Sequence, residues 1–208
     1  MKAFIFDLDG VIVSTDSFHY QAWKKMADEE GIYFDEIINN RLRGVSRMES
    51  LEIILERSEK AYTEKEKQVL AERKNAYYKD MLEALTPNDR LPGVTETLIG
   101  LREKGFKLAI GSSSKNTPII LKKIGYEKYF DAVSDGNNIQ KSKPDPEVFI
   151  KAAEYLGIEP KCCYVVEDAE AGIDAAVAGG FTPIGIGSAA NYDKAEHRLV
   201  KFSDLLTF

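Results

Sequence analysis

Two aspartates stand one residue apart near the start of the chain, directly after the short apolar run of residues 3–6. On a strand, side chains two positions apart point to the same face, so Asp7 and Asp9 can share one site. Two carboxylates that close repel each other, and a small hard cation such as Mg2+ allows both to stay ionised. Gly10 then permits a sharp turn or a close backbone approach to a ligand. The spacing therefore predicts a metal site, although an acidic turn after an edge strand would have the same sequence.

Polar residues follow later apolar runs in the same way. Residues 111–116 include three consecutive serines before an expected helix start, which suits an anionic oxygen. Lys143 is held by the following proline and can neutralise charge. Glu167 and Asp168 form a second acidic pair with oxygen ligands suited to Mg2+. Each motif alone is typical of a helix cap or a surface turn. Together they supply a nucleophile, a cation, a phosphate-oxygen donor and a lysine, which phosphoryl transfer requires.

Short β-type runs alternate with segments of helical pattern over most of the chain. The runs are residues 3–6, 107–110, 130–133, 163–166 and 183–186, with a possible last one at 199–202. Asn116 or Thr117 can cap one of the helices. Another helix is expected from Pro146 to Gly157, capped by Asp145. The alternation predicts an α/β fold with a Rossmann-like parallel sheet and helices on both faces. Ligands of such sheets bind beyond the carboxyl ends of the strands.

Residues from Ser14 to Thr86 interrupt this alternation, because they have helical periodicity and little strand signal. The segment from Thr86 to Gly93 has the composition of a linker back to the sheet. We therefore expect a core domain of residues 1–14 and 90–208, with an α-helical cap domain of residues 15–89 inserted after the first strand.

Composition limits the class of protein. The 208 residues suffice for one full domain and a smaller one, and 44% hydrophobic with 30% charged residues is ordinary for a globular protein. A net charge of -6 argues against a general nucleic-acid partner. The first residues do not form a signal peptide, and no apolar run approaches the roughly 20 residues of a membrane helix. We expect a cytoplasmic monomer. Adjacent Cys162 and Cys163 are predicted to be buried free thiols.

The four motifs resemble those of the haloacid dehalogenase superfamily of phosphotransferases, and the insertion resembles the helical cap of its small-sugar branch. More narrowly, the chain is similar to the β-phosphoglucomutase family. Beyond the segment 7–12, this narrower resemblance rests on Thr15, His19, Ala22, Trp23, Gly44, Val45, Ser46, Arg47, Ser50, Leu51, Arg73, Lys74, Asn75, Ser114, Lys115, Asn116, Glu167 and Asp168. The cap positions are the specific ones, because many phosphatases share the core motifs.

The resemblance implies an Mg2+-dependent phosphomutase, an isomerase that forms an aspartyl phosphate. Asp7 would be the nucleophile and Asp9 the general acid and base. Ser112 and Lys143 would bind the transferring phosphoryl oxygens. The implied metal ligands are Asp7, the backbone carbonyl of Asp9, and Asp168, with Glu167 in support.

The resemblance also implies roles for the cap. Arg47 would grip the far phosphate of a bisphosphorylated sugar, because its planar fork suits phosphate oxygens. His19 and Lys74 would couple cap closure to the placement of Asp9, with Thr15 as the threonine of the hinge between core and cap. A solvent-facing Lys74 and a surface His19 are the structural alternatives. The implied substrate-binding residues are Trp23, Gly44, Val45, Ser46, Arg47, Ser114, Lys115 and Asn116, although the helical spacing of Trp23 is more typical of core packing.

The implied reaction interconverts β-D-glucose 1-phosphate and glucose 6-phosphate through β-D-glucose 1,6-bisphosphate as intermediate and activator. The alternative is an Mg2+-dependent sugar-phosphate phosphatase, in which water is the acceptor. A receiver-type phosphoacceptor is a third hypothesis, but receivers have no cap and place the acceptor on a later strand. Ser14, Arg43 and Ala169 depart from the family pattern, which affects substrate fine-tuning more than reaction type.

Overall fold

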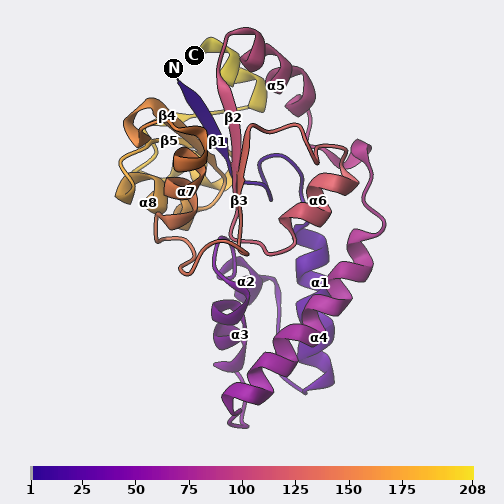
Figure 1. Ribbon diagram of the computed structural model, residues 1–208. Coiled ribbons are helices and arrows are strands. Elements are labelled where there is room, and N and C mark those ends of the chain that lie inside the picture. Colours follow the sequence, from indigo (N-terminus) through magenta and orange to yellow (C-terminus); the bar gives the residue numbers. More distant parts are fainter. Residues whose placement is uncertain (1) are drawn as a thin grey trace.

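Six parallel strands form one sheet, and their carboxyl ends face a helical unit beyond the sheet (Figure 1). The computed structural model describes residues 2–208. The strands are β1 (Ala3–Phe6), β2 (Lys107–Gly111), β3 (Ala132–Ser134), β4 (Cys163–Glu167), β5 (Thr182–Gly185) and β6 (His197–Arg198). Their order is β3-β2-β1-β4-β5-β6, with every neighbouring pair parallel. The predicted Rossmann-like sheet is confirmed, and its strand order reverses between β1 and β4.

The predicted last strand is present, but its bounds, predicted near residues 199–202, are wrong. The strand β6 lies earlier, at His197–Arg198, and pairs with β5. Phe202 instead begins the 3-10 helix η4 (Phe202–Thr207), in which Phe202 and Leu205 are buried. The apolar residues of this segment pack from a helical turn, which a short apolar run cannot distinguish from a strand.

Helices cover both faces of the sheet, because side chains alternate along each strand. Phe4 and Phe6 of β1 pack on the face that α5 (Val94–Glu103), α6 (Thr117–Lys123) and η4 cover. Ala3 and Ile5 pack on the opposite face, beneath α7 (Glu147–Leu156) and α8 (Glu170–Ala178). The predicted N-cap position is wrong by one residue, because α7 begins at Glu147 and its N-cap is Pro146. Oδ1 of Asp145 nevertheless accepts a hydrogen bond from the backbone N–H of Glu147 at 3.0 Å.

The inserted unit consists of α1 (Asp16–Glu29), α2 (Glu36–Asn40), α3 (Arg47–Leu55) and α4 (Glu64–Leu82), followed by η1 (Pro87–Asp89). Capping boxes begin α3 at Ser46 and α4 at Thr63. The helices enclose a separate apolar cluster that includes Trp23. However, the last turns of α4 join the cluster beneath the sheet through Tyr78 and Leu82. The cap therefore shares apolar contacts with the core at its upper end.

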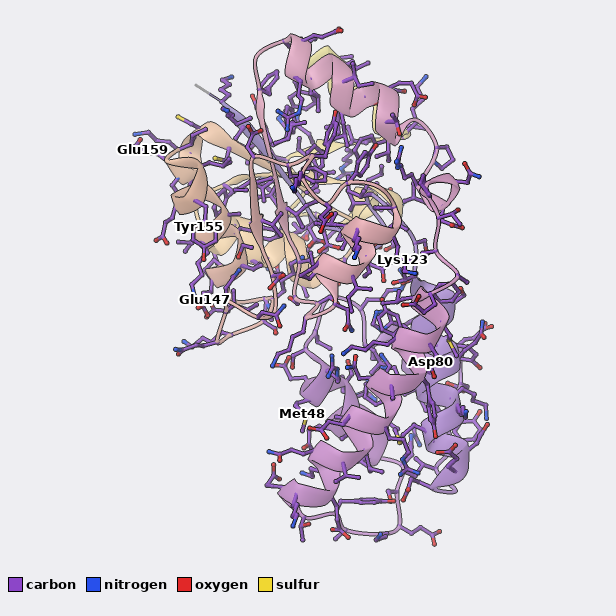
Figure 2. All side chains as sticks on the ribbon, turned by 45° about the vertical axis from the view of Figure 1, so that its right-hand side comes forward. Met48, Asp80, Lys123, Glu147, Tyr155 and Glu159 are labelled. Atoms are coloured by element: carbon purple, nitrogen blue, oxygen red, sulfur yellow. The ribbon has the colours of Figure 1, made fainter. Side chains whose placement is uncertain are left out.

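The two connections between core and cap lie side by side, because Val13 forms an antiparallel bridge with Arg90. The helices of the insertion fall within residues 15–89, and the domain limits themselves stay a prediction. Asp80 of α4 and Tyr155 of α7, which are labelled in Figure 2, are exposed on the surface. No helix within residues 2–208 combines the length and apolar character needed to cross a bilayer.

The remaining short helices are η2 (Pro160–Cys162) and η3 (Gly187–Asn191). Both cysteines are free thiols, as predicted. Cys163 is buried at the start of β4, but Cys162 is only half-buried, so the prediction of burial is wrong for Cys162.

Candidate active site

The two central strands end in the predicted acidic residues. Asp7 follows β1, and its backbone N–H donates to the carbonyl of Val166 on β4 at 2.9 Å. Glu167 closes β4 and Asp168 follows it. As a result, Asp7, Glu167 and Asp168 each offer a carboxylate oxygen within 4.8 Å of the other two. The structure thus brings together three of the four residues predicted around the metal, at the point where the strand order reverses.

Lys143 neutralises part of this cluster. Its Nζ lies 2.5 Å from Oδ1 of Asp7 and also donates to Oε1 of Glu167. The Lys143 side chain is only 1% exposed. Burial by itself lowers the pKa of Lys143, but the carboxylates of Asp7 and Glu167 outweigh burial and raise it above its usual value. Lys143 is therefore a fixed positive charge beside the candidate nucleophile.

Negative charge still exceeds positive charge at the site. Burial, with the neighbouring carboxylates of Glu167, Asp7 and Asp9, raises the pKa of Asp168 to about 8. Burial also raises the pKa of Glu167 to about 7, despite the attraction of Lys143. A buried set of hard oxygen donors with uncompensated charge fits Mg2+. Of the four predicted ligands, Asp9 contributes no carboxylate to this set, and the prediction for Asp9 concerned only its backbone carbonyl.

Gly10 permits the close approach of Asp168 to the turn after β1. Its φ of +81° lies in the left-handed region, and a Cβ at this position would come within 2.2 Å of Oδ2 of Asp168. Any side chain here would displace a candidate metal ligand. The close approach predicted for Gly10 is therefore present, and its partner is the Asp168 carboxylate.

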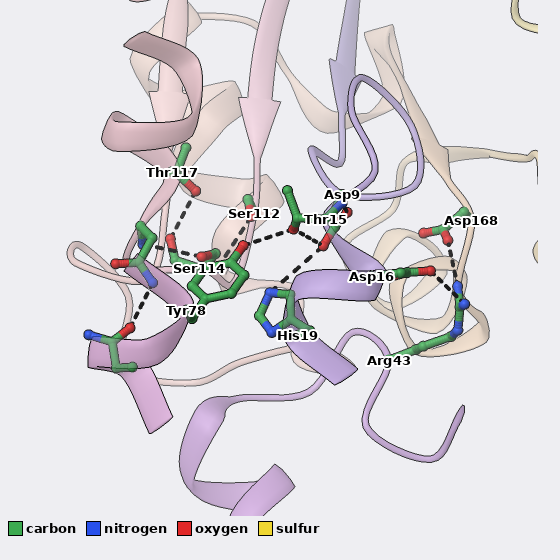
Figure 3. A network of polar contacts seen from close by, with 12 residues as sticks. Asp9, Thr15, Asp16, His19, Arg43, Tyr78, Ser112, Ser114, Thr117 and Asp168 are labelled. Atoms are coloured by element: carbon green, nitrogen blue, oxygen red, sulfur yellow. Dashed lines mark hydrogen bonds and ion pairs between the residues drawn. The ribbon is translucent and has the colours of Figure 1, made fainter. Parts of the chain in front are cut away.

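The carboxylate of Asp9 points to Thr15, directly before the first helix of the cap (Figure 3). The backbone N–H of Thr15 donates to Oδ1 of Asp9 at 2.6 Å, and the Thr15 hydroxyl donates to Oδ2 at 2.6 Å. Burial, together with the charge of Asp16, raises the pKa of Asp9 to about 7. A carboxyl group with a pKa near neutrality can both give and take a proton, which suits a general acid and base.

His19 and Lys74 approach Asp9 from the cap. Nζ of Lys74 lies 2.9 Å from Nδ1 of His19, whose Nε2 lies 3.8 Å from Oδ2 of Asp9. Lys74 is only 2% exposed and lies over the ring of Trp23, at 4.7 Å from its centre. Burial is the main cause that lowers the pKa of both His19 and Lys74. The alternative of a solvent-facing Lys74 is wrong, whereas the packing expected for Trp23 in the cap core is present.

A cavity of about 550 Å³ lies between the sheet and the cap. Apart from Thr15, every predicted site residue lines it. From the core these are Asp7, Asp9, Ser112, Ser114, Lys115, Asn116, Lys143, Glu167 and Asp168, and from the cap His19, Trp23, Gly44, Val45, Ser46, Arg47 and Lys74. Burial lowers the pKa of Arg47, yet no hydrogen bond or ion pair holds its guanidinium within residues 2–208. Arg47 is thus a positive group available to an anion in the cavity.

Hydrogen bonds from backbone N–H groups to serine hydroxyls stabilise the serine-rich loop after β2. The hydroxyl of Ser112 accepts from the N–H of Ser114 at 3.2 Å, and that of Ser114 accepts from the N–H of Asn116 at 3.1 Å. The side chain of Asn116 does not cap α6. Its Nδ2 instead donates to Oδ1 of Asn75 on α4 at 2.9 Å, so Asn116 joins core to cap. Helix-capping rules consider only neighbouring residues, so they could not predict a partner 41 positions away in the chain.

Sequence reasoning did not assign a catalytic or binding role to four residues around the site, which are Asp16, Arg43, Tyr78 and Ser113. Arg43 joins Asp16 to Asp168, and Tyr78 contacts Thr15. Ser113 lines the cavity, and its buried hydroxyl lacks a hydrogen-bond partner within the part of the chain that the structure describes. Tyr78 had one usable signal, because it follows Lys74 by four positions and so lies on the same face of the helix.

The family described as haloacid dehalogenase-like hydrolase matches residues 1–180. The chain belongs to this family. It is 45% identical over 189 residues to a β-phosphoglucomutase of Bacillus subtilis strain 168, covering 90% of this chain and 84% of the relative. It is 32% identical to a phosphorylated carbohydrates phosphatase of Thermotoga maritima, covering 94% of this chain and 89% of that protein.

Solved structures agree with this assignment to the haloacid dehalogenase-like family. The crystal structure of a β-phosphoglucomutase from Clostridium difficile has a TM-score of 0.93 at 40% identity, with 99% of this chain and 93% of that chain covered. The predicted α/β core with a helical cap is therefore confirmed. Mg2+ is the metal typical of this family, and the donor set of Asp7, Glu167 and Asp168 fits it.

Proposed function

We propose that this protein interconverts β-D-glucose 1-phosphate and glucose 6-phosphate through β-D-glucose 1,6-bisphosphate. The observation that supports this most is one cavity that contains both the Asp7–Lys143 pair of the core and Arg47 of the cap. A bisphosphorylated sugar must be held at its far phosphate while the near one reacts, and a phosphatase has less need of that second anchor. The Bacillus subtilis relative named β-phosphoglucomutase supports the same assignment.

The reaction follows from the positions of Asp7 and Asp9. An oxygen of Asp7 attacks phosphorus, forming an aspartyl phosphate as the bond from phosphorus to the sugar oxygen breaks. Asp9 gives its proton to that departing oxygen. When the donor is β-D-glucose 1,6-bisphosphate and its C1 phosphoryl group is transferred, glucose 6-phosphate departs. β-D-glucose 1-phosphate then presents its 6-hydroxyl, Asp9 takes the hydroxyl proton, and the phosphoryl group passes from Asp7 to that oxygen, which regenerates the bisphosphate. Protons and phosphoryl groups balance over the cycle.

The remaining core residues stabilise charge on the transferring phosphoryl group. Lys143 and the Ser112 loop lie at its oxygens, where fixed charge and N–H donors favour the transition state over the ground state. Asp7, Glu167 and Asp168 would hold Mg2+, which neutralises negative charge on the phosphoryl oxygens when bound. Arg47 of the cap and Ser114 and Lys115 of the core are assigned to the distal phosphate.

The test is a coupled assay that follows glucose 6-phosphate formation from β-D-glucose 1-phosphate, with and without added bisphosphate, while phosphate release is measured in parallel. We expect isomerisation that increases with bisphosphate and is absent with the α-anomer. Asp7→Asn should abolish it, and Asp80→Asn, which makes the same change on the exposed face of α4, should not. No turnover of the β-anomer by the wild-type enzyme would refute the proposal.

A sugar-phosphate phosphatase is the second candidate, because a Thermotoga maritima relative is named a phosphorylated carbohydrates phosphatase. Steady phosphate release that outpaces isomerisation with every hexose phosphate would favour it. A cytoplasmic monomer that acts on small sugar phosphates remains the expected form of the protein under either function.

A further inference from the structure

Tyr78 lies at the junction of cap and core. It is fully buried near the C-terminal end of α4 and packs in the apolar cluster beneath the sheet. Its ring is 4.1 Å from that of His19, centre to centre, and Nζ of Lys74 lies 4.8 Å from the ring centre. Its hydroxyl lies 2.8 Å from Oγ1 of Thr15 (Figure 3). The Tyr78 side chain therefore contacts both Thr15, which binds Asp9 through two hydrogen bonds, and the His19–Lys74 pair, which approaches Asp9 from the cap.

The number of available hydrogens decides which group donates in the hydrogen bonds between Tyr78, Thr15 and Asp9. Thr15 has a single hydroxyl hydrogen, and an ionised Asp9 can only accept. The hydrogen of Thr15 must then point to Oδ2 of Asp9, which leaves an oxygen lone pair of Thr15 for the hydroxyl of Tyr78. Tyr78 thus donates to Thr15, and Thr15 donates to Asp9. Within residues 2–208, the Tyr78 hydroxyl and Oδ2 of Asp9 are the two hydrogen-bond partners of the Thr15 hydroxyl.

We propose that Tyr78 is a positioning residue for the general acid and base. Its hydroxyl orients Thr15, and Thr15 in turn holds the Asp9 carboxylate through two hydrogen bonds. Because Tyr78 belongs to the cap and Asp9 to the core, the position of the proton-transfer group depends on how α4 docks against the sheet. Tyr78 is not among the residues that line the cavity between the sheet and the cap. This inference rests on the proposed role of Asp9 in phosphoryl transfer.

The chain offers a matched control in the neighbouring tyrosine. Tyr77 is on the same helix, and its hydroxyl donates to Glu29 of the cap at 2.8 Å, away from Thr15. Tyr78→Phe and Tyr77→Phe each remove one hydroxyl from one tyrosine of α4. A loss that comes from cap stability alone would follow both substitutions.

The measurement compares two phosphoryl donors. A sugar phosphate releases an alkoxide-like oxygen that needs the proton of Asp9, whereas acetyl phosphate releases acetate, which does not. Formation of phosphorylated enzyme from each donor is followed by rapid quench and intact-protein mass spectrometry. For Tyr78→Phe we expect the rate with the sugar bisphosphate to fall about 10-fold, as one misoriented proton-transfer group would cause. The rate with acetyl phosphate and the KM of the sugar substrate should stay within about twofold, as should all rates of Tyr77→Phe.

Equal losses with both donors, no loss in Tyr78→Phe, or the same loss in Tyr77→Phe would each overturn the proposal. If Tyr78→Phe does not fold, Thr15→Val removes the hydroxyl that lies between Tyr78 and Asp9. This variant must then lose rate with the sugar bisphosphate and not with acetyl phosphate. The donor comparison does not require isomerase activity. If the wild-type enzyme only releases phosphate from sugars, the proposed function fails, and the role of Tyr78 is still decided from phosphoenzyme formation.

Discussion

Nη1 of Arg43 in the cap lies 3.4 Å from Oδ2 of Asp168 in the core. The other terminal nitrogen, Nη2, lies 2.6 Å from Oδ2 of Asp16 at the start of α1 (Figure 3). The cap thereby places a guanidinium against a candidate metal ligand, and Asp16 holds it there. Cap docking and cation binding consequently share one carboxylate.

Arg43→Gln is expected to tighten Mg2+ binding about three- to tenfold in the absence of phosphate, because it removes a positive charge that repels the cation. Calorimetric titration of the purified protein with Mg2+ measures this. Arg41→Gln is the control, since Arg41 also lies between α2 and α3 but its ion pair, among the described residues, is with Glu56 at 2.7 Å. Unchanged or weaker binding in Arg43→Gln would mean that Arg43 orders Asp168 rather than competing for it.

Gly10→Ala is expected to abolish Mg2+ binding and sugar-phosphate turnover, because the added methyl group would displace the Asp168 carboxylate. Gly93→Ala has nearly the same backbone requirement, with φ of +77°, but within residues 2–208 no heavy atom beyond its two chain neighbours lies within 4 Å of the Cβ position. Both substitutions should lose about 1–2 kcal/mol of unfolding free energy to left-handed strain. Denaturant titration and Mg2+ calorimetry together separate the two effects, and equal loss of Mg2+ binding in both variants would contradict this account of Gly10.

Arg47→Lys keeps the positive charge but loses the planar pair of donors, so we expect the KM for a bisphosphorylated or monophosphorylated hexose to rise about 10-fold or more. Phosphorylation of Asp7 by acetyl phosphate, which has no distal phosphate, should be little changed. Steady-state kinetics with both donors provide the test. Arg57→Lys, beyond the end of α3 and exposed, is the control. A fall in kcat with unchanged KM would instead place Arg47 at the transferring group.

Glu30 contributes a pH-dependent stability to the cap. The Arg73 guanidinium and then the Tyr62 hydroxyl, at 3.0 Å, lower the pKa of Glu30 below its usual value, although burial opposes them. Stability from a lowered carboxyl pKa is fully present above the unfolded pKa of about 4.3 and is lost as the pH falls through the folded value. Glu30→Gln should therefore lower the melting temperature by about 2–4 °C at pH 7 and by much less at pH 3.

Thermal unfolding of wild type and Glu30→Gln over this pH range measures the difference. Glu64→Gln should show none at any pH, because its partner contact with Lys67 is exposed to solvent, with 81% of the Glu64 side chain accessible. A difference between wild type and Glu30→Gln that is constant with pH would show that the Arg73 contact does not depend on the Glu30 charge.

The sequence by itself determined the ends of the central strands and the chemistry that follows them. Asp7 comes directly after an apolar run, the pair Glu167 and Asp168 ends another, and Lys143 precedes the helix-start signal of Asp145 and Pro146. Parallel strands place such residues at one edge of the sheet. Local patterns suffice for this, because the periodicity of a strand and the punctuation of a helix depend only on neighbouring residues. The same patterns marked residues 15–89 as a helical insertion.

Only the tertiary structure decided which side chains meet across the junction of cap and core. Tyr78 on Thr15, Arg43 on Asp168 and Asn116 on Asn75 are pairs separated by 63, 125 and 41 positions. A hydrogen bond needs its two atoms within a few tenths of an ångström of 2.9 Å, and its angle above about 120°. Such placement depends on how α1 and α4 stand on the sheet, which is set by packing of the whole cap and leaves no local trace in the chain.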